Sequence, residues 1–503
     1  MIRGLDDLRR GFDDAADVVV VGTGAAGAVA AANFAAAGLR TVVLEAGPEV
    51  RPEDMTRDAP RFLSKYYWEG GLRLIRGKAA IPSMQGRCLG GSTVMNSAIM
   101  LKLPDWVRRD WAERDGLDGL MDPALDRAFE RIFEGTKTAP TPMTVMGKRN
   151  LAAARAMEAA GLHGVPLPRA VHDCKGCGDC LVGCSEGAKQ STDRAYIPRA
   201  LAGGARVYTC AEVDRVRTAG SKAVGVEGWV VDPVGRRRLS RFTVRAPRVV
   251  LAAGVMATPV ILKQSRIDPK GRVGKTFYAH LAGGVVGIMH ERIEPWIGAT
   301  QGWGAISEDI PGMKFECLWA DPSVLLVKWG GIGEGFLQKL GDVAHMTTIA
   351  VVYRGRCEGK IEVGANGRPK ASLRIPDDEA RTVFRGMKQV ADGLLATGAR
   401  YVSVGRMPGV PGELRSTRDT EGLLHTRLGE KHMAMTANHA FGSCRMSADP
   451  KRGPVDPEGK VRGVDGLFVC DTSIFPSPSA VNPQATCMAL SDVISRRIAE
   501  LPA

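Results

Sequence analysis

The stretch of residues 17–45 constrains the fold of this chain more than any other part of the sequence. It opens with the uninterrupted valine run of residues 18–21, breaks at the segment GTGAAG, and continues as an alanine-rich run to Gly38. This order predicts a buried strand, a tight turn and a helix, and residues 41–44 predict a second buried strand. Such a unit is typical of α/β folds that bind a dinucleotide at the turn.

Three glycines and one acid give this unit its predicted chemistry. Gly22 makes the turn, Gly24 lets the backbone approach a pyrophosphate, and Gly27 lets the helix pack on the strand. The phosphate charge then meets free N–H groups and the positive end of the helix dipole. Glu45, at the end of the second strand, is placed to accept a hydrogen bond from a ribose hydroxyl.

The same stretch has one competing interpretation, a membrane-spanning helix. Residues 18–39 carry no charge, and about 20 apolar residues are enough to cross a bilayer. Three glycines in a turn pattern and the valine-rich start favour strand, turn and helix instead. The first 16 residues hold charges of both signs and no apolar signal core, so we expect a cytoplasmic protein, with export on a partner's signal left open.

The composition is that of a globular protein. The chain is 44% hydrophobic and 24% charged, and its 503 residues are enough for several domains of about 150 residues each. The net charge of +13 comes from scattered basic residues, with one short run at 236–238. Scattered charge favours a solvated basic surface, so we expect no nucleic-acid partner.

A second glycine-rich block, GRCLGGSTVMN, spans residues 86–96. Gly90 and Gly91 allow the backbone to lie against a flat group, and Ser92 and Asn96 offer side-chain hydrogen bonds. The block therefore fits beside a ring system better than it forms a helix. Taken alone, it is equally well a plain glycine-rich loop.

The C-terminal part holds a dense block of polar residues between short apolar runs. Residues 467–470 predict a buried strand that ends at Asp471, in a placement like that of Glu45. Two such acids are consistent with two contacts to one extended cofactor. Taken alone, His439 is more often a structural histidine, and Asn482 before a proline is an ordinary turn residue.

The remaining segments predict a mixed chain without internal repeats. Helices are expected within 103–134 and 151–160, at 256–264, at 377–397 and at 485–498, and strands within 206–251 and 285–355. Tryptophans usually fill a core, although some line substrate pockets. We expect Trp106 and Trp111 in the core. We expect either a core or a pocket position for Trp296, Trp303, Trp319 and Trp329.

Four cysteines are spaced as in bacterial ferredoxins: Cys174, Cys177, Cys180 and Cys184. Soft thiolates on a glycine-rich loop can wrap a compact cluster, so the spacing predicts an iron–sulfur cluster, with four irons favoured over three. A structural zinc is the second alternative, and disulfides are the third. The run departs from the ferredoxin pattern because Ser185 replaces a proline and no second run exists.

These blocks, in this order, resemble the glucose–methanol–choline (GMC) oxidoreductase family over nearly the whole chain. The motifs are GTGAAG with its EAG, GRCLGGSTVMN, AAGVMATPVIL, HAFGSCRM and DTSIFPSPSAVNP. The resemblance implies an α/β fold in which a Rossmann-like FAD-binding domain is interleaved with an α+β substrate domain containing an antiparallel sheet. The implied FAD domain is 1–102, 203–280 and 440–503, with a helical and iron–sulfur insertion at 103–202 and a substrate domain at 281–439.

The resemblance also implies a role for each candidate residue. The resemblance implies that the ADP half of FAD is held by Gly22, Gly24, Gly27 and Glu45, and that Val213 contacts the adenine side. It implies that the flavin side is bordered by Gly90, Gly91, Ser92 and Asn96, and that Asp471 holds the ribityl or pyrophosphate region. The implied catalytic residues are His439 and Asn482, and Asn482 also lies beside the cofactor. Some relatives have a covalently linked histidine where this chain has Arg87, so noncovalent FAD is implied. Some sugar dehydrogenases of the family hold a three-iron cluster on a triad that Cys174, Cys180 and Cys184 reproduce.

The implied reaction oxidises an alcohol to a carbonyl. His439 would take the hydroxyl proton while hydride leaves for flavin N5, and the Asn482 amide would hold the oxygen. An iron–sulfur cluster passes electrons singly, which predicts a dehydrogenase with a one-electron carrier protein or small subunit as partner. The alternatives are an oxygen-using alcohol or sterol oxidase with structural cysteines, and a flavin and cluster electron-transfer protein without its own substrate. The small-molecule substrate is left open among aromatic, sterol and sugar alcohols.

Overall fold

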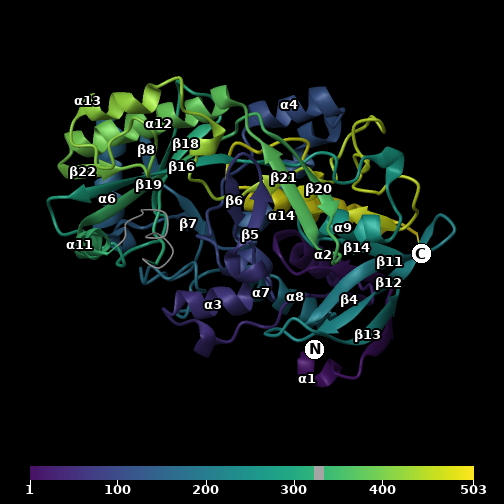
Figure 1. Ribbon diagram of the computed structural model, residues 1–503. Helices are drawn as coiled ribbons and strands as arrows, with labels where there is room; N and C mark the ends of the chain where they lie inside the picture. Colours follow the sequence, from purple (N-terminus) through teal and green to yellow (C-terminus); the bar gives the residue numbers. More distant parts are fainter. Residues whose placement is uncertain (322–332, 503) are drawn as a thin grey trace.

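A parallel β-sheet assembled from distant parts of the chain forms one half of the molecule (Figure 1). The computed structural model describes residues 1–321 and 333–502. The sheet order is β1 (Ile2–Arg3), β10 (Arg206–Tyr208), β4 (Thr41–Leu44), β3 (Val18–Val21), β14 (Arg248–Leu251) and β24 (Leu467–Val469), and every pair is parallel. Parallel strands buried on both faces are continuous apolar runs, which is why the central strands were predictable.

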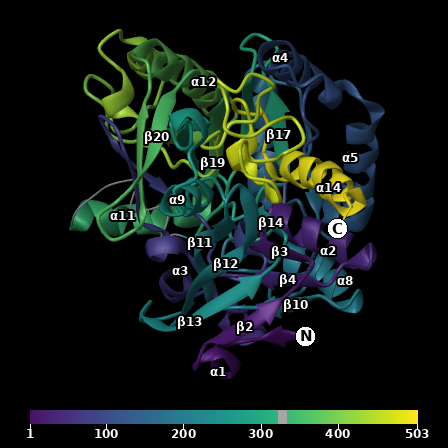
Figure 2. The same cartoon turned by 90° about the vertical axis from the view of Figure 1, so that its right-hand side faces the viewer.

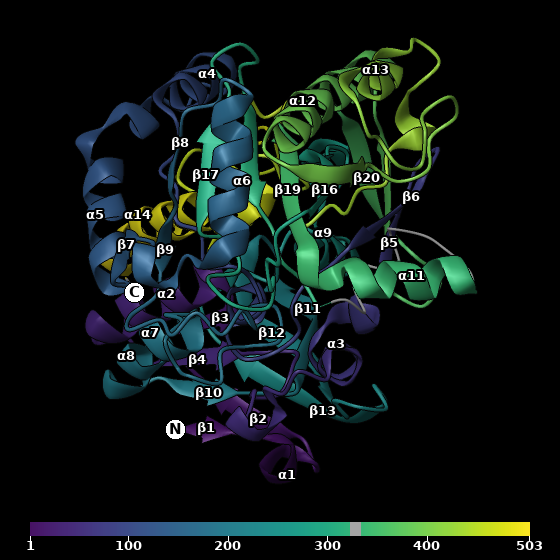
Figure 3. The ribbon, with the colours of Figure 1, turned by 90° about the vertical axis from the view of Figure 1, so that its left-hand side faces the viewer.

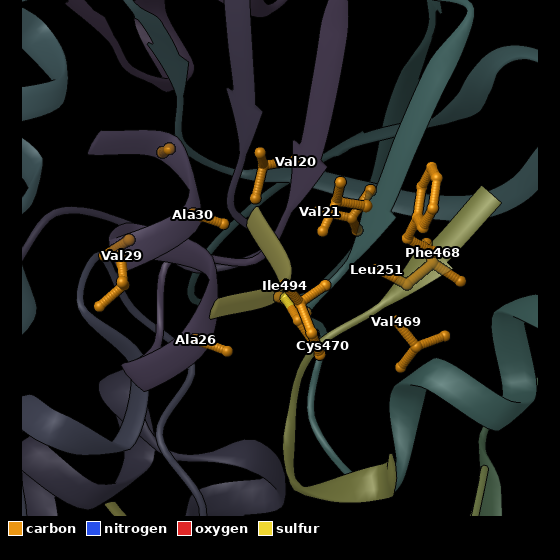
Figure 4. Packing of buried hydrophobic residues seen from close by; sticks show 14 of the residues in the cluster. Val20, Val21, Ala26, Val29, Ala30, Leu251, Phe468, Val469, Cys470 and Ile494 are labelled. Carbon is orange, nitrogen blue, oxygen red and sulfur yellow. The ribbon is translucent and has the colours of Figure 1, made fainter. Parts of the chain in front are cut away.

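Helices cover this sheet and meet each other closely. α2 (Ala25–Ala36) packs against α14 (Gln484–Glu500), which also contacts α5 (Pro123–Gly135), and α8 (Ile197–Ala202) lies against α2. Figure 4 shows the alanine-rich face of α2 and Ile494 of α14 beside the ends of the central strands. Small side chains let the two helices approach, and Asn33 ties them together by donating to Asp492 at 2.9 Å.

A four-stranded sheet extends the parallel half. It consists of β11 (Ala211–Ala219), β12 (Lys222–Val231), β13 (Arg238–Arg245) and β2 (Phe12–Ala15). In Figure 2, β13 and β2 lie below β14 and β3, on the side of the N-terminus. β11 begins at the end of β4, where the Ala211 N–H donates to the Glu45 carbonyl oxygen at 2.8 Å.

The other half is built on a six-stranded antiparallel sheet. Its order is β22 (Ala399–Ser403), β16 (Leu281–Met289), β19 (Met346–Tyr353), β18 (Met313–Cys317), β17 (Trp303–Ile306) and β8 (Gly164–Pro166). α12 (Asp377–Ala396) and α6 (Gly147–Ala159) cover one face (Figure 3). Alternate residues of β19, such as Ile349 and Val351, enter the core beneath these helices, so the residues between them face the other way.

Smaller elements complete the chain. A second four-stranded sheet contains β20 (Glu358–Val363), β21 (Pro369–Arg374), β5 (Arg73–Arg76) and β6 (Ala80–Ser83), and two-strand pairs are formed by β7 (Thr138–Pro140) with β9 (Pro168–Ala170) and by β15 (Tyr278–Ala279) with β23 (Ala440–Phe441). The other α-helices are α1 (Leu5–Leu8), α3 (Ala59–Tyr66), α4 (Asp105–Asp115), α7 (Thr192–Ala195), α9 (Ala257–Gln264), α11 (Glu334–Asp342) and α13 (Thr417–Thr420).

One expectation is confirmed and another needs correction. Residues 18–39 contain a strand, a turn and the whole of α2, as expected, which excludes the membrane-spanning alternative for them. In the described chain no helix combines the length and apolar character needed to cross a bilayer. Trp111 is buried as expected, but Trp106 is 40% exposed because it lies on the outer face of α4, beside Arg354. Trp329 falls outside the described residues.

Candidate functional site

One large cavity, of about 910 Å³, is bordered by both halves of the molecule. The carboxyl ends of β3 and β4 reach it from the parallel sheet, and Thr348, Ala350 and Val352 of β19 line it from the antiparallel sheet. Ligands of open α/β sheets bind at the carboxyl ends of the strands. The volume is near the upper end of the usual range for ligand pockets, about 300–1,000 Å³, which suits an extended ligand.

Most of the residues predicted from the sequence border this cavity: Gly22, Gly24, Glu45, Gly91, Ser92, Asn96, Val213, His439, Asp471 and Asn482. Gly27 and Gly90 do not. Gly90 instead donates its N–H to Thr23 Oγ1 at 2.9 Å, which joins the second glycine block to the first. The predicted pocket tryptophans Trp296, Trp303 and Trp319 are also absent from the lining, which has Trp68.

The glycines of the first turn are required for different reasons. At Gly27 a Cβ atom would lie 2.0 Å from the carbonyl oxygen of Gly22, so only glycine lets α2 approach β3. Gly22 itself has a φ of +104°, in the region that favours glycine. A Cβ atom at Gly24 would meet nothing within 4 Å. Gly24 therefore leaves open space at the start of α2, where unpaired N–H groups attract an anion.

The two buried acids also organise the loops around the cavity. Glu45 accepts from the Thr23 backbone N–H at 3.0 Å and its hydroxyl at 2.6 Å, and from the Gly47 N–H at 2.9 Å. Asp471 accepts from the Gly254 N–H at 2.9 Å and the Thr258 hydroxyl at 2.6 Å. Burial raises the pKa of both carboxyl groups. Each acid thus holds a glycine turn in place at the cavity wall.

The surroundings of the Arg87 side chain bear on whether the cavity fits an anionic dinucleotide. Its side chain is 1% exposed and borders the cavity, yet Nε and Nη2 have no hydrogen-bond partner among the described residues. The nearest recorded carboxylate oxygen, on Glu212, is 3.9 Å from Nη2, and the guanidinium lies 5.2 Å from the Trp68 ring centroid. A buried guanidinium with two nitrogens free of hydrogen bonds and the open position at Gly24 both fit a ligand that carries phosphate and ribose oxygens.

His439 is paired with a second histidine that sequence reasoning missed. The Nδ1 atoms of His280 and His439 are 3.1 Å apart, and the two rings meet at 86°. Burial lowers the pKa of His439 to about 3, with a smaller contribution from Lys314, while Glu316 acts in the opposite direction. Burial also lowers the pKa of His280 well below its usual value. Both imidazoles are therefore neutral near pH 7.

Asn482 contacts a buried ion pair that was also missed. Lys314 donates to the carboxylate of Glu316 and, at 2.5 Å, to Asn482 Oδ1. Gln301 donates to the other carboxylate oxygen of Glu316 at 3.1 Å. Burial opposes ionisation of Glu316, but Lys314 outweighs it and lowers the pKa of the carboxyl group. Asn482 also forms a hydrogen bond with Glu316, which helps to lower the pKa of that carboxyl group, so the amide has one N–H left to donate.

The four predicted metal ligands gather in one pocket, but the structure does not confirm a metal site. Cys174, Cys177, Cys180 and Cys184 line one small pocket. Among the described residues, no group of three or more histidine, cysteine or acidic side chains is arranged to hold a metal ion, so the expected metal centre is not confirmed. All eleven cysteines of the chain are free thiols, which is against the disulfide alternative.

Buried cations surround this cysteine pocket. Arg149, Arg169 and Lys189 are each at most 1% exposed, and none has a recorded salt bridge to a carboxylate within the described residues. Arg169 lies 3.6 Å from the Cys180 sulfur, and Lys189 donates to the carbonyl oxygens of Cys180, at 2.7 Å, and Asn96, at 2.9 Å. Burial opposes ionisation of the Cys180 thiol, but Arg169 and Lys189 outweigh it and lower its pKa. Burial raises the pKa of Cys177 to about 11, so the cations favour negative charge at Cys180 and not throughout the pocket.

The fold and this site define a dinucleotide-dependent oxidoreductase of the α/β class. The family described as GMC oxidoreductase matches residues 16–282 with its N-terminal model and residues 358–491 with its C-terminal model, so the chain belongs to the GMC oxidoreductase family. Enzymes of this family use FAD and act on CH–OH groups. The predicted family and fold class are confirmed.

The chain is also similar to particular proteins of known sequence or structure. The chain is 31% identical to an uncharacterized GMC-type oxidoreductase of Mycobacterium tuberculosis, over 95% of this chain and 74% of the relative. It is 26% identical to the long-chain-alcohol oxidase FAO4B of Arabidopsis thaliana, over 96% and 67%. Among solved structures, pyridoxine 4-oxidase from Mesorbium loti shares the fold with a TM-score of 0.70 and 18% identity, over 97% of this chain and all of that one. A formate oxidase variant from Aspergillus oryzae gives 0.71 and 15%, over 96% and 98%.

Proposed function

We propose that this chain is an FAD-dependent alcohol oxidoreductase in which His439 takes the hydroxyl proton and Asn482 holds the reacting oxygen. The observation that carries the proposal is that these two residues, from separate blocks, border one cavity and both lie beside the pair of Lys314 and Glu316. FAD, when bound, supplies the acceptor for the hydride. A neutral imidazole is a suitable base, and this kind of catalysis contributes about 10²–10⁴-fold.

The proposed cofactor contacts use the residues that border the cavity. The pyrophosphate would meet the open N-terminus of α2 at Gly22 and Gly24, and the ribose would meet Glu45, with Val213 at the adenine. Gly91, Ser92, Asn96 and Asp471 would border the rest of the cofactor, while Gly27 and Gly90 act through packing. Arg87 adds a donor that the motif alone did not predict. The proposed cofactor domain remains 1–102, 203–280 and 440–503, with 103–202 as an insertion and 281–439 as the substrate domain.

An apolar alcohol is the substrate class that the cavity favours. The antiparallel sheet lines it with small or aliphatic side chains: Ala282, Gly284, Val286, Leu318, Ala350 and Val352. Such a wall removes apolar surface from water but offers few partners to the many hydroxyls of a sugar. The long-chain-alcohol oxidases of Arabidopsis thaliana among the relatives support the same choice.

For the electron acceptor, we propose that the four cysteines hold an iron–sulfur cluster that relays electrons singly to a carrier protein. Support comes from their shared pocket and from the three buried cations around it, because an uncompensated buried charge is costly and a thiolate-bound cluster is anionic. Lys189 joins Cys180 to Asn96 beside the large cavity, and Leu181, the next residue after Cys180, lines that cavity. A structural zinc on the same thiols remains the alternative, and analysis of the protein for iron, sulfide and zinc distinguishes the two.

A second candidate is an oxygen-using alcohol oxidase, which the names of the curated relatives favour. The two differ in how the reduced flavin is reoxidised. The test is to bleach the flavin anaerobically with a panel of primary alcohols, then admit either air or a one-electron dye, on protein analysed for iron and sulfide. Fast reoxidation in air and no iron would refute the cluster proposal. Full turnover by His439→Ala with every alcohol would refute the assignment of the base.

A further inference from the structure

The contact between the two buried histidines has a consequence for the tautomer of each ring. Only one hydrogen fits between Nδ1 of His280 and Nδ1 of His439, which are 3.1 Å apart. Either His439 donates this hydrogen and His280 accepts it, or the reverse. A ring that donates from Nδ1 while neutral has its lone pair on Nε2. The direction of this one hydrogen bond therefore decides whether His439 Nε2 is a proton acceptor.

The ring of His280 is held in place beside His439. Its backbone N–H donates to the His439 carbonyl oxygen at 3.1 Å, and its ring packs on Phe441 with centroids 4.9 Å apart. The side chain is 3% exposed, and Nε2 has no hydrogen-bond partner among the described residues. No carboxylate therefore backs His280, and the charged groups that act on the pair are Lys314, Glu316 and Arg354.

We propose that His280 is a positioning residue that holds His439 in the Nδ1–H tautomer, so that Nε2 of His439 accepts the proton of the substrate hydroxyl. This inference rests on the proposed role of His439 as base. In the step, the O–H proton moves to Nε2, the electron pair of the C–H bond leaves as hydride to FAD, and the carbonyl forms. The hydrogen on Nδ1 stays between the two rings throughout.

The arrangement differs from one in which a carboxylate orients the catalytic histidine. A neutral imidazole can accept the Nδ1 hydrogen of His439 as a carboxylate can, but it stabilises the imidazolium less. His439 therefore returns its proton readily and remains an unprotonated base at mildly acidic pH. The activity should accordingly persist below the usual pKa of histidine.

A matched pair of variants tests this proposal. Asn places its Oδ1 where histidine has Nδ1, so His280→Asn keeps an acceptor for the Nδ1–H of His439, whereas the equally sized His280→Leu removes it. We expect kcat to fall by about tenfold to a hundredfold in His280→Leu, with KM, flavin content and Tm little changed, and to stay within about threefold of the parent in His280→Asn. In His280→Asp, the acid limb of the kcat–pH profile should move to higher pH, because a carboxylate stabilises the imidazolium.

The outcomes separate this inference from the function on which it depends. Unchanged kcat in His280→Leu would overturn the positioning role, and so would an equal loss in His280→Leu and His280→Asn at full flavin content. His439→Asn is measured alongside. If that variant keeps full turnover, the proposed base itself is wrong. If His439→Asn is inactive and His280→Leu is unimpaired, only the positioning role fails.

Discussion

Removal of Lys314 gives a sharp test of the buried ion pair, because stability and activity should respond differently. The Lys314 and Glu316 side chains are 2% and 4% exposed, so Lys314→Met leaves a nearly buried carboxylate without its counter-charge. Breaking such a pair costs about 3–5 kcal/mol, whereas replacing both partners by neutral groups costs little. Lys314→Met combined with Glu316→Gln should therefore recover most of the stability lost by the single variant.

The size of the thermal effect follows from the length of the chain. An unfolding entropy of about 2.1 cal/mol/K per residue amounts to about 1 kcal/mol/K for 503 residues, so 3–5 kcal/mol lowers Tm by about 3–5 °C. Tm is read by far-UV circular dichroism at matched flavin saturation, because bound ligand itself raises Tm. The double variant should lie within about 1 °C of the parent.

Activity should not follow stability in this pair of variants. Both lack the ammonium group that holds Asn482 Oδ1, so both should lose at least about tenfold in kcat. Glu316→Gln alone is the control, since it keeps Lys314 in contact with Asn482. An unchanged Tm in Lys314→Met, or a double variant as unstable as the single one, would refute the ion-pair reasoning. Recovery of kcat in the double variant would refute the link to Asn482.

Three further predictions concern the glycines of the first turn, the loss of stability at acidic pH, and Arg87. Gly24→Ala should fold with a normal Tm but lose FAD, because its Cβ enters open space where the pyrophosphate is expected. Gly27→Ala should fail to fold, because its Cβ meets a carbonyl oxygen at 2.0 Å. Flavin absorbance and circular dichroism distinguish the two variants. The folded-state pKa of His439 is about 3, below its unfolded value of about 6.5, so the unfolded chain binds the extra proton and stability should fall as the pH drops from about 6.5 towards 3. Urea unfolding across that range should show a smaller decline for His439→Asn. Arg87→Met should raise the Kd of FAD at least about tenfold without lowering the Tm of the apoprotein, because its guanidinium has two unpaired nitrogens there, and equilibrium dialysis measures this.

Local patterns were enough for the cofactor half of the site. The valine run of β3, the glycines after it and Glu45 lie within one short unit whose strand and helix depend on neighbouring residues, so their order predicted their geometry. Asp471 could be placed in the same way, because it directly follows a buried apolar strand. The final helix and α12 were predicted from their apolar spacing for the same reason.

The substrate half could not be read from spacing in the same way. Lys314 and Glu316 alternate with apolar residues on β18, a pattern that ordinarily means a solvent-exposed face, and only the packing of the sheet against the cavity buries them. His280 is an isolated histidine in the sequence and gains its meaning from a partner 159 residues away. Trp106 was expected in the core because a tryptophan is large and apolar, yet α4 turns it outwards.

By itself the sequence determined the family, through short motifs, and the strand, glycine turn and helix of residues 18–36, because each of these depends on residues close together along the chain. Tertiary structure alone decided that the two histidine rings meet, which charges are buried beside Asn482, and which cations line the cysteine pocket. These features arise where segments far apart in sequence meet. Their energies depend on the water that is excluded there, which no local pattern records.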